Sequence, residues 1–379
     1  MINSLSRRSD YNTLENTVYL NQASLGLISE GSINAMHEFL DKIARHGNSM
    51  MTDQEEIEFL DSLRNNAAKL FNCTKNKLAV LSSASELLNQ LPYLLAPKQG
   101  EKVILVSTDF PALYRPWQAF SEKNKIQITF VEDKRNKDLT KAIADSIDNN
   151  TSVLVVSYVQ FSTGSKVDII SLRKITKKYG IKLVVDVTQA AGAIPVNCKD
   201  WNCEAIICSG YKWLGGHGGV GLAVLSEELM KKTPLMPGWM GAENPFFTSH
   251  KSLSLAKGAK RYTQSTMSYV SIKGLEISIR EILDLNVINI EKHSMDLKKI
   301  FIEMLRNTSW NIFHNQHSDL SSSNIICISE NNKDIKKVSN ILNNKNIICS
   351  YRNRYLRFSL AHFNNEADIQ KCIKCLQEL

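Results

Sequence analysis

The chain contains 379 residues, of which 43% are hydrophobic and 22% are charged. A chain of this length can bury a large core and form two domains, or one large and one small, without a disulfide framework. The net charge of +8 comes from 46 lysines and arginines against 38 acidic residues. Because the basic residues are scattered rather than gathered in one tract, we expect no nucleic-acid partner.

Residues 1–12 are polar and the apolar runs of the chain are short. A secretory signal or a bilayer span needs a longer apolar stretch, so we expect a cytoplasmic protein without a membrane partner. The eight cysteines are then expected to be reduced and mostly buried. Cys372 and Cys375 have zinc-site spacing, but no second pair matches them and they lie in a helical pattern. We therefore expect no metal site.

Seven short apolar runs alternate with amphipathic stretches over the first two thirds of the chain. The runs are rich in valine and isoleucine and bounded by polar turns, as strands buried on both faces are. Helical stretches such as 136–147 and 168–179 separate them. This order predicts an α/β domain with a mainly parallel, helix-covered sheet of seven strands. The predicted strands are 78–81, 103–107, 126–131, 152–159, 183–187, 205–208 and 220–225.

The pattern changes after residue 225. Residues 234–264 are rich in glycine, serine and phenylalanine and indicate an ordered loop region, and one long helix is predicted over 269–304. Strands at 324–329, 347–351 and 356–360 and helices at 334–343 and 367–379 then predict a smaller α+β domain. We expect an N-terminal segment at 1–26, a large domain at 27–265 and a small C-terminal domain at 266–379, which the N-terminal segment joins.

Two polar residues follow neighbouring strands of the predicted sheet. Asp186 ends one strand, and Lys212 follows the next strand between Tyr211 and Trp213. Ligands of parallel α/β sheets bind at the carboxyl ends of the strands. Taken singly, the aspartate is more often a cap or turn residue and the lysine a solvated one. An ammonium group among aromatic side chains is costly, however, and a desolvated lysine is a candidate for Schiff-base chemistry.

A third segment runs from a strand into a helix at 81–86 and carries small and hydroxyl side chains, including Ala84 and Ser85. A helix N-terminus of this kind can hold a phosphate, although taken alone the segment is simply a good N-cap. Residues 216–221 match G-x-G-x-x-G, but a strand-like run follows them where a dinucleotide-binding motif requires a helix. We therefore interpret the glycines as a hairpin and exclude a nicotinamide-dependent oxidoreductase.

The combination of these features is more specific than any one of them. The candidate phosphate-binding segment at 81–86 is followed by Asp186 at a strand end and, 26 residues after Asp186, by the aromatic-flanked Lys212. Nearly the whole chain resembles the pyridoxal-phosphate enzymes of fold type I, and within them the class V aminotransferase family. That group includes cysteine desulfurases, selenocysteine lyases and isopenicillin N epimerase-like proteins. The stretches that carry the resemblance are 159–164, 185–189 and 210–214, supported by 19–26, 109–111, 356–359 and 363–366.

The resemblance implies a role for individual residues. Lys212 would form the Schiff base with pyridoxal 5'-phosphate and move the α-proton of a substrate bound as an external aldimine. Asp186 would pair with the pyridine nitrogen, Gln189 would bond the ring hydroxyl, and Phe110 would stack on the ring. The implied phosphate ligands are Ala84, Ser85, Ser209 and Tyr211. The implied substrate ligands are Arg357 for the α-carboxylate, with Asn21 and Gln22.

The resemblance also implies a homodimer with the active site at the subunit interface. Residues 261–266 resemble the segment that reaches the partner's phosphate, with Thr266 as the contact. The family pattern has an acidic residue at the position of Thr263 and a glycine at that of Ser265. These departures leave the contact at Thr266 open.

We expect an enzyme that acts on an α-amino acid by transamination or β-elimination, the latter as a C–S lyase. A cysteine desulfurase or an amino-acid epimerase is an alternative. Desulfurases carry a reactive cysteine on a loop, and residues 349–357 leave almost no room for it. Cys349 is interpreted as a strand residue. A non-catalytic binding or regulatory protein is a further alternative, which the presence of Lys212, Asp186 and Arg357 argues against.

Overall fold

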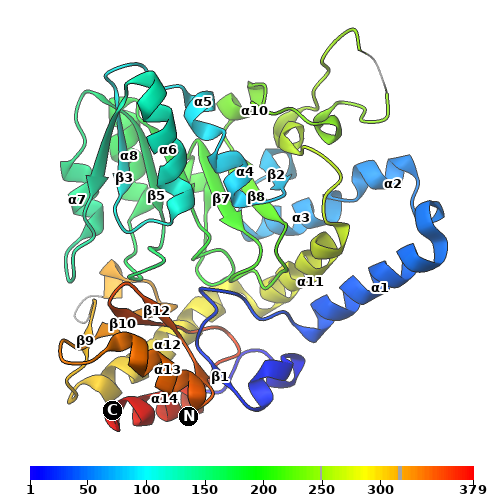
Figure 1. Ribbon diagram of the computed structural model, residues 1–379. Helices are drawn as coiled ribbons and strands as arrows, with labels where there is room; N and C mark the ends of the chain where they lie inside the picture. Colours follow the sequence, from blue (N-terminus) through cyan, green and yellow to red (C-terminus); the bar gives the residue numbers. More distant parts are fainter. Residues whose placement is uncertain (248–249, 315–317) are drawn as a thin grey trace.

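A seven-stranded sheet forms the centre of the larger part of the molecule in the computed structural model, which describes residues 1–247, 250–314 and 318–379 (Figure 1). Strand β8 runs antiparallel to its neighbours β2 and β7, and the other neighbouring strands pair in parallel. Each strand begins and ends within two residues of its prediction. In order across the sheet the strands are β2 (Leu78–Leu81), β8 (Gly221–Leu225), β7 (Ala205–Ser209), β6 (Lys182–Asp186), β5 (Thr151–Ser157), β3 (Lys102–Val106) and β4 (Gln127–Val131).

Both faces of this sheet are buried under helices. Along β3, Val103 and Leu105 pack into the core on one face, whereas Ile104 and Val106 pack into the core on the other. This two-residue alternation explains why the strands are almost wholly apolar. The first face is covered by α4 (Ala84–Leu88), α5 (Leu91–Leu95), α6 (Pro111–Asn124) and α10 (Glu227–Lys231). The second is covered by α3 (Asp61–Leu70), α7 (Leu139–Asp145), α8 (Ile169–Tyr179), α9 (Cys198–Trp201) and α11 (Tyr269–Leu285). The predicted three-layer α/β domain is confirmed.

The C-terminal part has a separate antiparallel sheet in the strand order β12-β13-β10-β9. A single apolar core joins it to three helices. The strands are β9 (Asn311–Ile312), β10 (Ile325–Ser329), β12 (Ser350–Arg352) and β13 (Tyr355–Ser359), and the helices are α12 (Val287–Leu305), α13 (Ile335–Asn344) and α14 (Glu366–Gln377). The smaller α+β unit predicted from the sequence is confirmed. Cys372 and Cys375 are both buried in α14.

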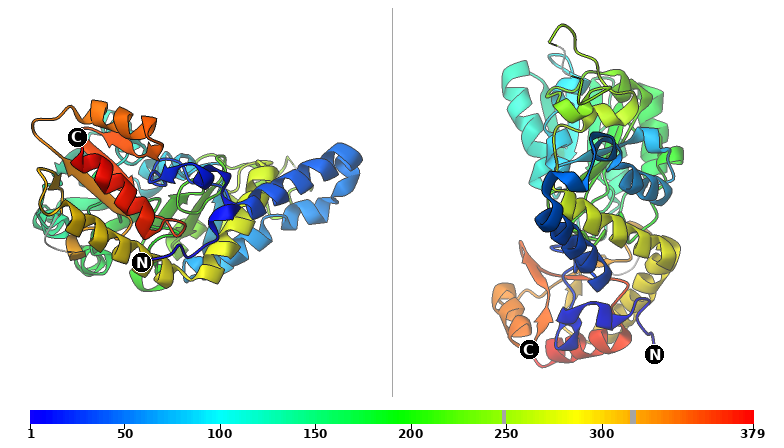
Figure 2. Two further views of the ribbon diagram at one scale, coloured as in Figure 1. Left: turned by 90° about the horizontal axis from the view of Figure 1, so that it is seen from below. Right: turned by 90° about the vertical axis from the view of Figure 1, so that its right-hand side faces the viewer.

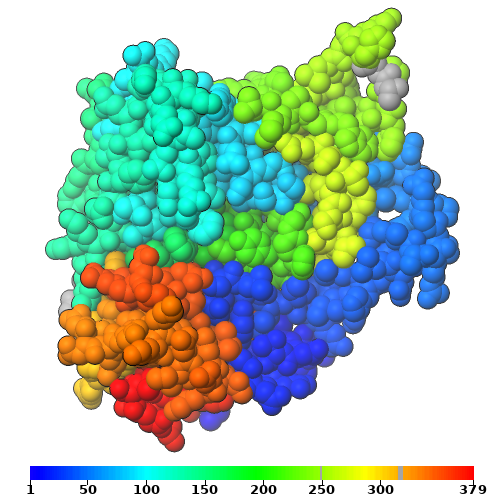
Figure 3. All heavy atoms as spheres, viewed as in Figure 1, coloured from blue at the N-terminus to red at the C-terminus, as the bar shows by residue number. Residues whose placement is uncertain are grey.

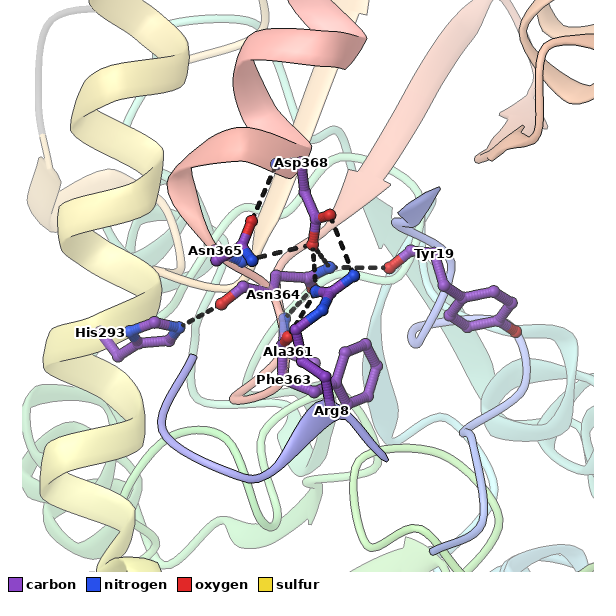
Figure 4. Close-up of polar contacts among 8 residues, drawn as sticks. All are labelled: Arg8, Tyr19, His293, Ala361, Phe363, Asn364, Asn365 and Asp368. Carbon is purple, nitrogen blue, oxygen red and sulfur yellow. Dashed lines mark hydrogen bonds and ion pairs between the residues drawn. The ribbon is translucent and has the colours of Figure 1, made fainter. Parts of the chain in front are cut away.

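The N-terminal segment is fixed to this C-terminal unit. Strand β1 (Val18–Tyr19) pairs in parallel with β11 (Ile347–Ile348). The Asn364 side-chain amide donates to the Tyr19 carbonyl over 3.0 Å, and the Arg8 guanidinium donates to the Asp368 carboxylate over 2.8 Å (Figure 4). Figure 3 shows the N-terminal residues in dark blue beside the orange C-terminal elements. These contacts hold residues 21–24 at the boundary between the two sheets.

Helices α1 (Glu30–His46) and α2 (Asp53–Glu58) form an arm that projects from the body of the molecule, as the left view in Figure 2 shows. Leu40 and Ile43 of α1 are exposed on this arm. No helix in the described ranges combines the length and the apolar character that a bilayer crossing requires.

Two predictions of secondary structure were wrong in detail. The long helix predicted over 269–304 is two helices, α11 and α12, because Asn286 between them has φ of 64° and its side chain caps α12 by accepting from the Ile288 N–H. The strand predicted over 347–351 is divided at Cys349, because β11 pairs with β1 whereas β12 pairs with β13. The domain boundary at residue 266 stays a prediction; α11 packs on the large sheet and α12 on the small one.

Candidate active site

The carboxyl ends of β5, β6 and β7 meet at a cavity of about 230 Å³. It collects every residue for which the sequence predicted a cofactor contact except Thr266. Its lining is formed by Ser83, Ala84, Ser85, Leu88, Phe110, Ala112, Leu113, Ser157, Phe161, Asp186, Thr188, Gln189, Ser209, Tyr211 and Lys212. Segments that lie far apart in the sequence are thus brought together where the parallel topology places a ligand site.

Lys212 lies on the loop that follows β7 and is only 7% exposed. Burial lowers the pKa of its amine to about 8, although the Asp186 carboxylate opposes this shift. Its Nζ is 5.3 Å from the centre of the Phe110 ring and 5.8 Å from that of Tyr211. Trp213, which is buried next to Lys212, anchors the loop. A large fraction of the Lys212 amine is therefore neutral, and nucleophilic, at pH values at which an ordinary lysine is almost fully protonated.

Asp186 is buried at the end of β6. Its carboxylate accepts from the Thr188 N–H over 2.8 Å and from the Thr188 hydroxyl over 3.1 Å. Burial raises the pKa of this carboxyl, whereas Thr188 and Lys212 stabilise its charged form. A buried carboxylate of this kind favours a cation across the cavity, such as a protonated ring nitrogen.

Gln189 is fixed at both ends of its side-chain amide. Its Nε2 donates to the Ala23 carbonyl over 3.1 Å, and its Oε1 accepts from the Trp213 indole over 2.8 Å. The residue lines the cavity and connects the N-terminal segment to the lysine loop. Its predicted bond to a ring hydroxyl stays a prediction.

The start of α4 forms one wall of the cavity. Ser83 is the N-cap and accepts from the Glu86 N–H over 3.2 Å. The N–H groups of Ala84 and Ser85, which precede Glu86 in the first turn, have no acceptor within the helix. Gly221 of β8 lies against this turn, and a Cβ there would come within 2.6 Å of the Ala84 nitrogen. The close approach brings β8 and the helix start together beside the cavity.

Arg357 of β13 is 1% exposed and reaches toward the cavity from the small sheet. Its guanidinium donates to the Phe161 carbonyl over 2.6 Å, and Phe161 lines the cavity. The charge of Arg357 also contributes to the lowered pKa of Lys212. The predicted carboxylate ligand and the predicted Schiff-base lysine therefore lie within electrostatic reach of each other.

Asn21 and Gln22 lie beside the site but do not line the cavity. The Gln22 amide donates to the Lys212 carbonyl over 3.0 Å and accepts from the Leu27 N–H over 3.0 Å. Asn21 has a buried Oδ1 without a partner among the described residues. Their roles toward a substrate stay predictions, and the contact of Gln22 positions the lysine loop.

Thr266 lies apart from this cavity and is exposed. The predicted contact with a partner subunit stays a prediction.

Several residues that form the site were not assigned roles from the sequence. Thr188 holds Asp186, and the buried Asp109 accepts from the Gln160 amide over 2.8 Å. Burial raises the pKa of Asp109 to about 7. Both lie inside the family stretches; the partner of Thr188 is Asp186, two residues earlier, whereas Asp109 accepts from the Ser157 N–H and the Gln160 amide, about 50 positions away. Only the folded arrangement shows what these side chains hold in place.

Comparisons with known proteins agree with this architecture. The family profile described as Aminotransferase class-V matches residues 18–372. The uncharacterized aminotransferase YcbU of Bacillus subtilis is 22% identical over 97% of this chain and 95% of that protein. A probable cysteine desulfurase of Mycoplasma genitalium is 23% identical over 93% of this chain and 89% of that protein. The structure of the cystine C–S lyase C-DES with cysteine persulfide superimposes with a TM-score of 0.88, 16% identity and coverage of 97% and 99%.

The chain belongs to the aminotransferase class-V family. It is accordingly a pyridoxal-phosphate-dependent enzyme, as the resemblance in its sequence implied. The residues present fit this cofactor: the cavity holds a buried lysine with a lowered pKa, a buried carboxylate and an aromatic ring. The helix start at Ser83 supplies N–H donors suited to a phosphate.

Proposed function

We propose that the protein converts an α-amino acid by transamination or β-elimination, with pyridoxal phosphate attached at Lys212. The observation that carries the proposal is the pairing of two buried groups in one cavity, the Lys212 amine and the Asp186 carboxylate. Burial alone would leave both groups uncharged, and each favours the charged form of the other. Buried amine and carboxyl groups with shifted pKa values of this kind are typical of sites where protons are transferred.

Each residue of the site has a distinct task in this proposal. The cofactor, when bound, withdraws electrons from the substrate's α-carbon. Asp186 holds a proton at the ring nitrogen, and the Lys212 amine takes the proton from the α-carbon and returns it. Arg357 orients the substrate through its α-carboxylate. The apolar walls around Lys212 keep water from the reacting atoms.

A desulfurase that uses its own thiol is disfavoured by the cysteines. Seven of the eight are buried, and Cys73 is half-buried. Burial raises the pKa of the Cys349 thiol to about 12 and that of Cys327 to about 12. Asn353 and Arg354 alone connect β12 to β13, so no cysteine-bearing loop extends from this hairpin. Reactive thiols need the opposite setting, exposed and electropositive.

The proposal includes a homodimer. Large apolar side chains are exposed within 235–247 and at Leu253, near Thr266, and Gly238 packs closely on Gln264. Contiguous exposed apolar side chains are typical of protein interfaces. The exposed members are Leu235, Met236, Trp239, Phe246, Phe247 and Leu253. Sedimentation equilibrium of the purified chain should give twice the chain mass, and a monomer would contradict this part of the proposal.

Covalent attachment of the cofactor tests the proposal directly. The chain is incubated with pyridoxal phosphate, reduced with borohydride, digested and analysed by mass spectrometry. The adduct should lie on Lys212 and disappear in Lys212→Ala. Lys298 is an internal control, because burial lowers its pKa to about 8 as well, yet it does not line the cavity. An adduct on Lys298, or none on Lys212, would overturn the proposal.

The reaction is assigned by product analysis. The cofactor-loaded protein is incubated with pools of amino acids, with and without a keto-acid acceptor. An amino product that depends on the acceptor indicates transamination, whereas ammonia and a keto acid without an acceptor indicate β-elimination. Racemised amino acid in place of either would contradict both.

A further inference from the structure

Two arginines meet at a single serine hydroxyl beside the active site. The Arg357 guanidinium donates to Ser24 Oγ over 2.7 Å, and the Arg352 guanidinium donates to the same oxygen over 2.9 Å. Arg352 and Arg357 lie on the paired strands β12 and β13, and Ser24 lies on the N-terminal segment. The contact therefore holds two positive charges side by side.

The residues around the two arginines do not neutralise them. Neither guanidinium lies within 4.0 Å of a carboxylate in the described part of the chain. The partners of Arg357 are neutral: the Ser24 and Ser350 hydroxyls and the Phe161 carbonyl. Arg352 donates only to Ser24 Oγ and to the carbonyl of Tyr351 within the described ranges. Like charges held together at low exposure are costly unless anions accompany them.

The pair is placed next to the cavity. Phe161, whose carbonyl accepts from Arg357, lines the cavity. Ala23, which precedes Ser24, accepts from the cavity residue Gln189. The charges of both arginines reach Lys212, because each contributes to the lowering of its pKa. An anion that binds Arg352 would therefore lie beside an amino acid positioned at Lys212 and Arg357.

We propose that the substrate is an α-amino acid whose side chain carries a second anionic group, which Arg352 binds while Arg357 binds the α-carboxylate. This inference rests on the proposed function. A substrate with one carboxylate would leave one guanidinium uncompensated, whereas a dianion offers one acceptor to each. Ser24 acts as the positioning residue, because its oxygen fixes the separation of the two guanidinium groups.

Unreactive acids test the inference without turnover. Succinate and butyrate share a four-carbon chain, and glutarate and pentanoate share a five-carbon chain, so each pair differs by one carboxylate. Their dissociation constants are measured by calorimetry on the cofactor-loaded protein at low ionic strength, where charge contacts are least screened. We expect the better diacid to bind at least tenfold more tightly than its monoacid.

Substitutions distinguish the role of Arg352 from that of Arg357. Arg352→Gln should reduce the diacid preference to within about twofold and leave monoacid binding nearly unchanged, because it removes one charge-assisted contact. Arg354→Gln is the matched control, since Arg354 lies in the same hairpin and contacts Tyr355 rather than Ser24. It should keep the full preference.

Three results would count against the inference. Equal affinities of diacid and monoacid for the wild type would overturn it, as would a diacid preference that survives Arg352→Gln. A loss of monoacid binding equal to the loss of diacid binding would show that both arginines hold one carboxylate, which also overturns it. A chain that takes up no pyridoxal phosphate at Lys212 overturns the proposed function as well, so the two failures are distinguishable.

Discussion

The side chain of Gln22 holds the backbone of Lys212, through a 3.0 Å hydrogen bond from the Gln22 amide to the Lys212 carbonyl. The same amide accepts from the Leu27 N–H, and Gln22 is almost fully buried. A residue close to the N-terminus thus fixes the loop that carries the reactive amine. Since the N-terminal segment is anchored on the C-terminal unit through β11, this bond also links the small unit to the active site of the large one.

Gln22→Ala should lower both stability and cofactor binding. The substitution leaves the Leu27 N–H without its acceptor and removes one of the two hydrogen bonds to the Lys212 carbonyl, which also accepts from the Gly215 N–H. The loss of such a partner costs about 1–3 kcal/mol. Urea denaturation should show this loss, and Lys212 should take up pyridoxal phosphate more slowly. Gln118→Ala is the control, because Gln118 is an exposed glutamine on α6, and its effect should stay within about 0.5 kcal/mol. Equal stability of the two variants would contradict the assigned contact.

The pH dependence of cofactor uptake should reveal the lowered pKa of Lys212. Only the neutral amine attacks the aldehyde, so the rate should rise as pH increases through a pKa of about 8. Free Nα-acetyl-lysine, treated in the same buffers, supplies the profile of an unperturbed amine and corrects for the titration of the cofactor itself. Asp186 stabilises the ammonium form, so Asp186→Asn should move the midpoint to lower pH. A midpoint equal to that of the free amine would refute the shift.

The architecture of the large domain was predictable because the burial of each strand is visible in that strand's own residues. Strands such as β3 are buried on both faces and therefore consist of consecutive apolar residues, which the sequence displays directly. That Asp186 and Lys212 meet in one cavity was predictable for a related reason. Asp186 and Lys212 follow adjacent strands, and parallel pairing brings the ends of such strands to one edge.

Long-range side-chain contacts were not predictable. Ser24 and Arg352 are 328 positions apart, and no periodicity in either segment indicates that they meet. The amide of Gln22 was expected to approach a substrate, because the family pattern places it near the site. That role stays a prediction; the partners that the structure shows are backbone groups, which become neighbours only when the N-terminal segment packs across the lysine loop.

The break between α11 and α12 shows the same limit on a smaller scale. Apolar periodicity continues through Asn286, yet this residue has φ of 64° and caps the second helix. Asn286→Ala should reduce the free energy of unfolding by about 1–2 kcal/mol, through the loss of the cap and because alanine tolerates a positive φ less well than asparagine does. Asn286→Gly relieves the strain and should cost only a few tenths of a kcal/mol. Urea denaturation measures both, and equal losses would contradict the role of backbone strain.

The close approach of β8 to α4 predicts a specific effect on phosphate binding. A Cβ at position 221 would lie 2.6 Å from the Ala84 nitrogen and 2.6 Å from the Ser83 carbonyl carbon, so backbone atoms must move. Gly221→Ala should therefore displace the first turn of α4, with an overpacking cost of about 1–3 kcal/mol. If half of that cost falls on the phosphate contacts, the Kd for pyridoxal phosphate should rise by about twofold to tenfold.

Gly218→Ala is the matched control for this prediction, because Gly218 lies in the loop directly before β8 and a Cβ there meets no atom within 4 Å. Fluorescence titration of both variants with pyridoxal phosphate and with pyridoxal separates the phosphate contacts from the ring contacts. Gly221→Ala should weaken the binding of pyridoxal phosphate more than that of pyridoxal, since only pyridoxal phosphate has the phosphate group that the helix start binds. An equal loss of affinity for the two ligands would show that the substitution acts on the ring contacts or on the fold. It would then contradict phosphate binding at the start of α4.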